Sequence, residues 1–264
     1  MRLVDTHCHL DFNTFDTDRE IVLRRAMDLG LSRFLVPGVD LVSSHHAIEL
    51  AGADAAIFAA VGVHPNEALS WQADSIDILH HLAIHPKVVA IGEIGLDYYR
   101  DCAPKELQAR IFREQLNLAA DLGLPVVIHS RQAMEDTLEI LVSWQQAMIA
   151  SGSVLYEHPG VLHSFSGLLD EAQRAIQANF LIGVTGPVTY PNAHELRKTI
   201  SSLDLEDLLI ETDSPFLTPQ PQRGKRNEPA YVCYVAEKLA EIFNLSPESV
   251  ASTTTNNAGR IFDW

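Results

Sequence analysis

The sequence of 264 residues is poor in cysteine and has no long apolar run. Its three cysteines, Cys8, Cys102 and Cys233, are too few for a disulfide framework, as is usual for proteins of a reducing compartment. No apolar run reaches the ~18 residues that a membrane-spanning helix needs, and the first residues do not resemble a signal peptide. We therefore expect a soluble, cytoplasmic protein that does not bind a membrane.

Basic residues are also scarce, with 19 lysines and arginines against 35 acidic residues and a formal net charge of −16. This balance disfavours nucleic-acid binding through bulk electrostatics, because such binding depends on basic side chains that neutralise phosphates. A polyanionic substrate would need a local positive centre, which bound metal ions could supply. Glycine-rich phosphate loops of the G-x-G-x-x-G or Walker type are missing too, which argues against a nucleotide-binding open sheet.

Short apolar runs alternate with amphipathic helical stretches along the whole chain. The apolar runs predict eight strands, at 3–7, 33–36, 57–61, 88–91, 125–128, 161–163, 180–184 and 208–211. Eight helices are predicted near 18–30, 41–52, 73–85, 105–123, 133–147, 169–179, 192–202 and 229–243, and a last helical turn begins at Pro247.

This pattern matches the order and size of a (β/α)8 TIM barrel, which typically has ~250 residues. A doubly wound open sheet is the alternative, since both folds are built from βαβ units. No linker or change of composition divides the chain, so we expect a single domain over residues 1–264. The segment 148–160 is the least regular part, and we expect a loop there before the sixth strand.

Histidine is abundant, with 12 residues in the chain. Half of them lie in polar-faced helical stretches, where we expect solvated positions: His45, His46, His80, His81, His85 and His194. Others follow the predicted strands. His7 and His9 are two residues apart at the end of the first strand, so both can point to the same side. The ends of four further strands carry one ligand-type residue each: Glu93, His129, His163 and Asp213.

In TIM barrels the catalytic residues come from the carboxyl ends of several strands. Each of these six side chains alone has an ordinary explanation, such as a packed histidine, a helix cap or a salt bridge. Together they would place several polar groups face to face on one rim, which is costly unless a cation satisfies them. The set therefore predicts a metal site.

Six ligands exceed what one tetrahedral ion with an open water position takes, so the set indicates two divalent ions. A carboxylate can bridge two ions through its two oxygens, and Glu93 is the best candidate for the bridge. One ion would be held by His7, His9, Glu93 and Asp213, and the other by Glu93, His129 and His163. Mixed imidazole and carboxylate ligands suit zinc, manganese, iron or cobalt better than magnesium or calcium, but the sequence does not choose the metal.

At these residues the chain resembles the TatD family of metal-dependent hydrolases, within the amidohydrolase-like barrels. The matching motifs lie at 5–10, 62–65, 90–99, 125–131, 163–167, 209–215, 223–229 and 255–262, in the order of the family. Ser164 stands where cysteine is common in the family, which should not disturb the ligand His163. The segment 148–160 looks longer than usual, and we expect it to affect access of the substrate.

The resemblance implies the same assignment of ligands, with Glu93 as the bridge and Asp213 beside the attacking water. It also implies a deoxyribonuclease, often a 3′-to-5′ exonuclease, although some relatives have other hydrolytic roles. The expected substrate is therefore nucleic acid, as strand ends or short single strands, and no obligate protein partner is expected.

The expected mechanism is attack on a phosphodiester by a water that two ions activate, with Asp213 as general base. Glu93 would take part as the bridging ligand. His64, after the third strand, could contact a substrate phosphate, assist the leaving group or merely orient its loop. Four loop cations could hold flanking phosphates or remain solvated: Arg131, Arg223, Lys225 and Arg226. Tyr98 and Tyr99 could stack on a base or pack against the rim.

Two other classes of function stay open. Related barrels hydrolyse amides, lactones or phosphotriesters, and an aminoacyl ester is also conceivable as a substrate. Their two-metal versions often bridge the ions with a carboxylated lysine, whereas the corresponding position here is Glu93 and no predicted strand ends in lysine. A non-catalytic metal-binding or scaffold protein would need the same ligands but no base at Asp213.

Overall fold

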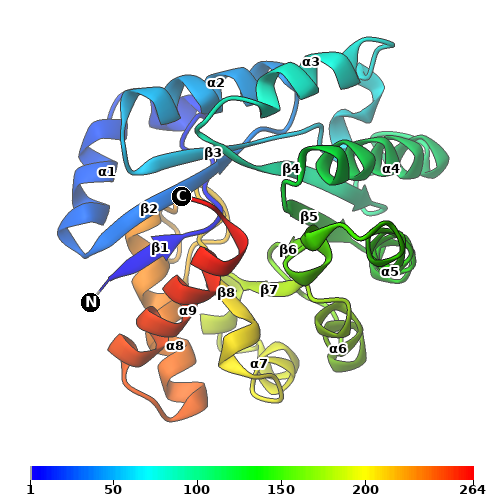
Figure 1. Ribbon diagram of the computed structural model, residues 1–264. Coiled ribbons are helices and arrows are strands. Elements are labelled where there is room, and N and C mark those ends of the chain that lie inside the picture. Colours follow the sequence, from blue (N-terminus) through cyan, green and yellow to red (C-terminus); the bar gives the residue numbers. More distant parts are fainter. Residues whose placement is uncertain (1) are drawn as a thin grey trace.

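Eight parallel strands follow one another around the molecule in chain order, with helices between them (Figure 1). The computed structural model describes residues 2–264. The strands are β1 (Leu3–Asp5), β2 (Leu31–Pro37), β3 (Ile57–Val61), β4 (Val88–Asp97), β5 (Val126–Arg131), β6 (Gly160–Leu162), β7 (Leu181–Val184) and β8 (Leu208–Ile210). The helices are α1 (Arg19–Asp28), α2 (Leu41–Ala53), α3 (Ser75–Ala83), α4 (Lys105–Leu122), α5 (Met134–Ser151), α6 (Leu169–Gln177), α7 (His194–Ile200), α8 (Val232–Phe243) and α9 (Pro247–Ile261). The predicted (β/α)8 barrel is confirmed.

The barrel is not fully closed, because within residues 2–264 no regular ladder joins β8 to β1. Cys8 and Ser214 form an isolated parallel bridge across this seam between the first and last strands. The buried carboxylate of Asp5 adds a side-chain connection, accepting hydrogen bonds from the backbone N–H (2.9 Å) and the hydroxyl (2.6 Å) of Thr212. Side chains therefore reinforce the few backbone hydrogen bonds that cross the seam, such as the one from the N–H of His9 to the carbonyl of Ser214 (2.8 Å).

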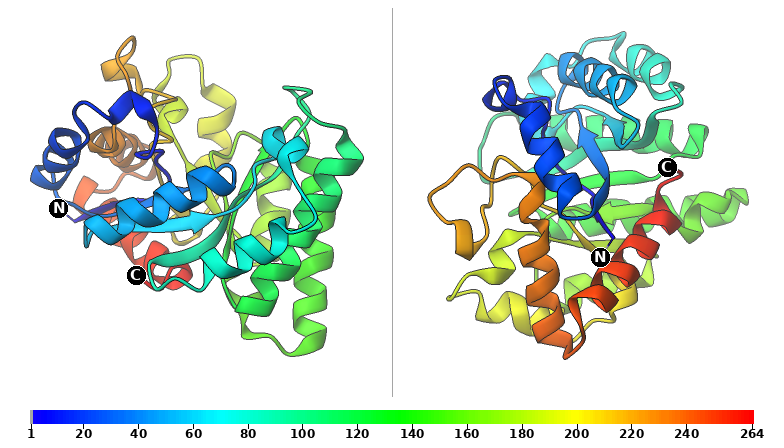
Figure 2. Two further views of the ribbon diagram at one scale, coloured as in Figure 1. Left: turned by 90° about the horizontal axis from the view of Figure 1, so that it is seen from above. Right: turned by 90° about the vertical axis from the view of Figure 1, so that its left-hand side faces the viewer.

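The amino-terminal half of the barrel is filled by apolar side chains. Inward-facing residues such as Val4, Leu35, Val127 and Leu209 form one cluster, which Phe262 completes after α9. Helix α9 packs against β1 and β8 at this end, and Figure 2 shows the red helix beside the blue strand. Since this end is closed, a site inside the barrel can open only at the carboxyl ends of the strands.

Strand β4 is longer than predicted, running from Val88 to Asp97 instead of ending at residue 91. The glycines that interrupt its apolar pattern are needed for close packing. A Cβ atom on Gly95, whose φ is +142°, would lie 2.0 Å from the carbonyl oxygen of His129 on β5. Glu93 therefore lies within the strand and not after it, with its side chain buried in the barrel mouth.

The segment 148–160 is not a loop at the mouth. Helix α5 continues to Ser151, and a 3₁₀ helix over Val154–Glu157 precedes β6. This connection leads from a helix into the amino end of a strand, and Asn179, just before β7, donates a hydrogen bond to the carbonyl of Tyr156 (2.9 Å). The expectation that this segment affects substrate access is therefore wrong, because it lies at the opposite end of the barrel.

The last predicted helical turn is a helix of 15 residues, Pro247–Ile261. Its start at Pro247 agrees with the prediction, and Ser246 caps it by accepting a hydrogen bond from the backbone N–H of Ser249 (3.1 Å). The sequence understated its length because threonine and asparagine are weak helix formers. Burial compensates: the amide of Asn257 donates to the carbonyls of Leu205 and Leu208 at 2.8 and 2.9 Å. Within residues 2–264, no helix has both the length and the apolar character required to cross a membrane.

Candidate metal centre

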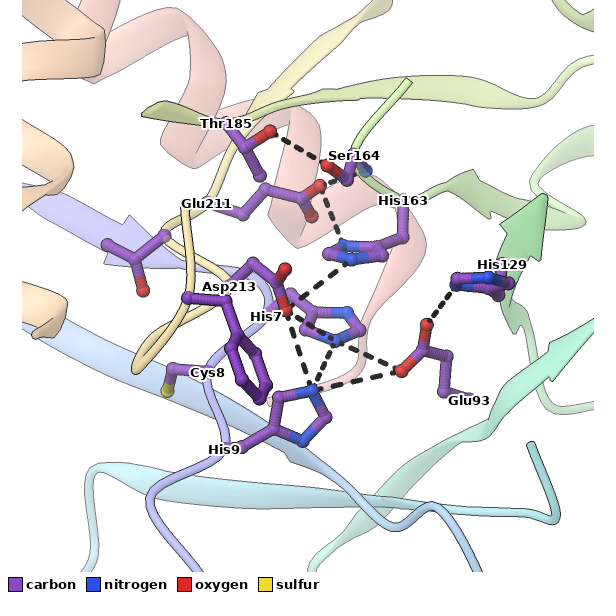
Figure 3. A network of polar contacts seen from close by, with 12 residues as sticks. His7, Cys8, His9, Glu93, His129, His163, Ser164, Thr185, Glu211 and Asp213 are labelled. Carbon is purple, nitrogen blue, oxygen red and sulfur yellow. Dashed lines mark hydrogen bonds and ion pairs between the residues drawn. The ribbon is translucent and has the colours of Figure 1, made fainter. Parts of the chain in front are cut away.

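Four side chains from three separate strand ends meet in the barrel mouth (Figure 3). The Nε2 atoms of His7 and His9 lie 3.3 Å apart. Oε2 of Glu93 lies 3.4 Å from Nε2 of His7 and 3.8 Å from that of His9. Oδ1 of Asp213 faces the same two nitrogens, at 3.9 Å from His7 and 3.5 Å from His9.

These separations fit a single cation. Metal–ligand bonds of ~2.0–2.2 Å at tetrahedral angles place ligand atoms ~3.3–3.6 Å apart. The two histidine nitrogens lie 3.3 Å from each other and 3.4–3.9 Å from the carboxylate oxygens. Imidazole nitrogens and carboxylate oxygens are also the donors that zinc and related transition metals take. The donor set that the sequence predicts for the first ion is therefore brought together.

The second oxygen of Glu93 faces a different group. Oε1 lies 2.9 Å from Nδ1 of His129 and 3.7 Å from Nε2 of His64. These three residues come from β4, from β5 and from the start of the 3₁₀ helix over Pro65–Ser70 after β3. The two carboxylate oxygens of Glu93 thus point to two different sets of histidines, which is the arrangement that a bridging ligand requires.

The sequence predicts that His163 and His129 hold the second ion together, but in the structure His163 contacts other residues. Its ring stacks on His7 with centroids 3.4 Å apart. Its Nδ1 lies 2.9 Å from Oε1 of Glu211, and its Nε2 lies 3.7 Å from Oδ1 of Asp213. Three-residue groups close enough to share an ion include His7 with His9 and Asp213, His7 with His163 and Glu211, and His64 with Glu93 and His129.

Glu211 is one residue of the centre that the sequence interpretation missed, and buried Asp97, whose Oδ2 lies 3.3 Å from Nε2 of His129, is another. Glu211 is fully buried at the end of β8, where its carboxylate accepts a hydrogen bond from the backbone N–H of Ser164 and faces His163. One signal for it was present: Glu211 is two residues before Asp213, and a carboxylate in a buried strand requires a partner. A carboxylate behind a histidine orients the ring and makes it a better ligand.

The carboxyl groups of Glu93 and Asp213 have lowered pKa values, because the histidines compensate for burial. Burial alone would raise the pKa of Glu93, but the facing histidines hold that pKa well below its usual value. Burial would also raise the pKa of Asp213, and its contact with His9 helps to lower it below the usual range. Both carboxyl groups therefore favour the ionised form, which is the form that binds a cation.

His64 sits beside the centre as a neutral ring. Burial and the neighbouring His129 lower the pKa of His64 to about 3. Its Nδ1 accepts a hydrogen bond from the backbone N–H of Asn66 (3.1 Å), so the proton of the neutral ring is on Nε2. His64 therefore presents a donor toward the mouth and not a lone pair for a metal.

Hydrogen bonds behind the centre fix the turn that carries Asp213. The backbone of Asp213 has a φ of +54°, and its N–H donates to the carbonyl of His7 (2.8 Å). The amide of buried Asn227 donates to the carbonyls of Thr212 and Phe216, on either side of the turn. The left-handed conformation is tolerated best by glycine, asparagine and aspartate, and here fixed contacts on both sides maintain it.

The four predicted loop cations differ in their surroundings. Arg131 and Arg223 lie over the rings of Tyr99 and Tyr190, with the guanidinium carbon 3.9 and 4.3 Å from the ring centroid, and both arginines are exposed. Lys225 is exposed too, and its Nζ donates to the side chain of Gln222.

Arg226 is engaged elsewhere. Its guanidinium pairs with both carboxylate oxygens of Asp18, at 2.9 and 2.7 Å, and also donates to the carbonyl of Thr14. The predicted surface histidines are exposed except His85, which is half-buried.

Similar proteins are known along the whole chain. The family described as TatD related DNase matches residues 4–263. The uncharacterized metal-dependent hydrolase YabD of Bacillus subtilis is 42% identical over 260 residues, covering 98% of each chain. The 3′-5′ ssDNA/RNA exonuclease TatD of Escherichia coli is 35% identical over 267 residues, again covering 98% of each.

A solved structure extends the comparison to the fold. The TatD homolog YjjV of Escherichia coli has a TM-score of 0.91 and 34% identity, covering 100% of this chain and 98% of that one. Both the sequence and the barrel are thus shared over the full length, and the chain belongs to the family of TatD-related DNases.

Proposed function

We propose that this hydrolase is a two-metal phosphodiesterase that shortens single-stranded nucleic acid from its 3′ end. Membership of the family makes it a metal-dependent hydrolase, and several similar proteins are named 3′-5′ ssDNA/RNA exonuclease. The single observation that carries the proposal is the set of distances among His7, His9, Glu93 and Asp213, which suits a cation at the mouth of the barrel.

The proposed ligands of the first ion are His7, His9, Glu93 and Asp213. The second ion would be held by Glu93, His129 and His163. Its site fits only in part, since the two ring nitrogens of His129 face Glu93 and Asp97, and those of His163 face Glu211 and Asp213. When bound, the ions would supply an activated water and positive charge for the reacting phosphate.

The other roles belong to side chains of the chain itself. Asp213 is the proposed general base, because its carboxylate faces the two histidines of the first site and can accept a proton from water there. Glu211 orients His163. His64, with its proton on Nε2, is proposed to donate a hydrogen bond to a phosphate oxygen, where a fixed donor stabilises charge that develops in the transition state.

Exposed cations on the rim are the proposed contacts for flanking phosphates. Arg131, Arg223 and Lys225 remain in this role, because none of them is paired with a carboxylate within residues 2–264. Arg226 instead ties its loop to Asp18. With few such contacts, the affinity for duplex DNA should be low, so strand ends and short single strands are the expected substrates.

The test is digestion of 5′-labelled single-stranded DNA and RNA by the purified protein. We expect stepwise shortening from the 3′ end, complete loss after chelation, and recovery on addition of manganese, zinc or magnesium. Asp213→Ala should abolish turnover, whereas Asp28→Ala, which removes an exposed carboxylate of α1, should not. Activity that persists in chelator would refute the proposal.

Parallel assays on amide, lactone and aminoacyl-ester substrates separate the other candidates. Turnover of one of these substrates without phosphodiester cleavage would show that the enzyme hydrolyses that other type of bond. Metal binding without turnover of any substrate would favour a scaffold.

We also propose that residues 1–264 act as one unit and that the protein is cytoplasmic. The packing of α9 against β1 and β8 supports the first point, and a single unfolding transition would test it. The three cysteines are free, which suits a reducing compartment, and cell fractionation would test the second point.

A further inference from the structure

Exposed aromatic side chains are confined to the mouth of the barrel. Among residues 2–264 only two large aromatic side chains are more than half exposed: Tyr99, with 56% of its surface exposed, and Phe216, with 51%. Tyr99 follows β4 and Phe216 follows β8, so both stand at carboxyl ends of strands. Arg131 covers one face of Tyr99, whereas Phe216 has no such cover.

Phe216 stands beside the proposed first metal site. Its ring meets Phe12 edge to face, with centroids 6.0 Å apart and planes at 79°. Phe12 in turn stacks on His9, with centroids 4.7 Å apart. Phe216 also contacts His9 itself edge-on, at 6.3 Å and 69°. Neither contact is a parallel stack, and 51% of the surface of Phe216 stays exposed, so the ring has open surface for another flat group.

The ring is also held in place. The backbone N–H of Phe216 donates to the carbonyl of Asp213 (2.8 Å), and its carbonyl accepts from the buried amide of Asn227. The turn that positions the proposed base thus positions the aromatic ring. A fixed aromatic side chain loses little conformational entropy when a ligand stacks on it.

A single exposed apolar residue is ordinary on a protein surface. Phe216 differs because it lies next to a proposed metal ligand and shares a rigid turn with Asp213. The net charge of −16 also leaves this protein few cations with which to hold a polyanion. Stacking of bases on aromatic rings supplies affinity without basic residues and tolerates any base sequence.

We propose that Phe216, supported by Phe12, is the stacking platform for the base of a nucleotide that flanks the scissile phosphate. The inference rests on the proposed function, because it assumes that a nucleic-acid phosphate occupies the mouth. A stacked base is worth ~1–3 kcal/mol, which corresponds to about a 5- to 150-fold change in affinity.

The test compares oligonucleotides that carry one abasic nucleotide at the terminal, the penultimate or the fifth position from the 3′ end. For the wild type, the abasic nucleotide should raise KM about 5- to 150-fold at one of the first two positions and have little effect at the fifth. In Phe216→Ala that base dependence should disappear, and Phe216→Trp should retain it. Leu245→Ala, which removes a comparably exposed side chain at the closed end of the barrel, is the matched control.

A binding measurement keeps the inference apart from the proposed function. In the metal-loaded protein, read before turnover, stacking should quench the fluorescence of 2-aminopurine placed at the same position, and Phe216→Ala should lose the quenching. DNA that quenches on binding but is never cleaved would refute the exonuclease and support the platform. Cleavage with equal base dependence in wild type and Phe216→Ala would refute the platform alone, and a wild type that neither binds nor cleaves would refute both.

Discussion

Oε1 of Glu211 lies 2.9 Å from Nδ1 of His163, and both side chains are buried. This pair joins the end of β8 to the end of β6 and leaves Nε2 of His163 facing the mouth. A carboxylate in this position usually decides how well the histidine binds a metal.

We therefore expect Glu211→Gln to lower metal affinity by about 10- to 100-fold. Calorimetric titration with Mn²⁺ or Zn²⁺ measures the effect, and the exposed Glu237→Gln on α8 is the control. An unchanged affinity in a folded Glu211→Gln variant would show that the pair is only structural.

His64 offers a second test, because its donor nitrogen can be replaced in part. His64→Ala should lower kcat on single-stranded DNA by about 10²- to 10³-fold, the usual loss when a fixed donor to the transition state is removed. His64→Gln should recover some of that loss, since an amide N–H can donate at a similar reach. Equal kcat values for the two variants, with a lowered melting temperature in both, would point to a role in folding of the loop.

Asn227 connects stability with activity. Asn227→Ala leaves the carbonyls of Thr212 and Phe216 without their side-chain donor, which should lower the free energy of unfolding by ~1–3 kcal/mol. Because the turn with Asp213 then loosens, kcat should fall as well. Urea unfolding and turnover measure the two effects, and exposed Asn117→Ala on α4 is the control. A variant with lower stability but unchanged kcat would contradict the coupling.

The pair of Arg226 and Asp18 predicts a pH dependence of stability. The hydrogen bond from Arg226 lowers the pKa of Asp18 below its usual value. A carboxyl group with a lowered pKa in the folded state stabilises the protein above its unfolded pKa and loses that contribution as the pH falls through its folded pKa.

Arg226→Ala should therefore reduce the free energy of unfolding at pH 7, by ~1 kcal/mol or less because the pair is partly exposed. The difference from wild type should shrink progressively below pH ~4 and also in high salt. Urea titrations at a series of pH values measure it. A difference that stays constant into acid would mean that Arg226 acts through its packing on Phe15.

The sequence allowed the barrel and most of the centre to be predicted, because both depend on local patterns. Alternation of apolar runs and helices defines the fold, and His7, His9 and Asp213 stand where strands end. The spacing of residues in the sequence could not predict which side chains of the centre contact one another. His163 pairs with Glu211 and not with His129, because side-chain orientation decides between neighbours on the same rim.

Long-range contacts also decide what a loop residue does. Arg226 looked like a substrate contact, but its partner Asp18 lies 208 residues earlier and is brought close only by the barrel. A long-range contact also explains the length of β4. Its glycines suggested that the strand ends early, but Gly95 is required by the close approach of the backbone of His129 on β5.

The incomplete seam between β1 and β8 has a consequence for heating. His7 and His9 follow the first strand of the sheet and Asp213 follows the last. A cation that these residues share would therefore connect the two edges of the sheet. Removing the cation should therefore lower the temperature at which the protein unfolds, and thermal melts followed by circular dichroism with and without chelator measure the difference.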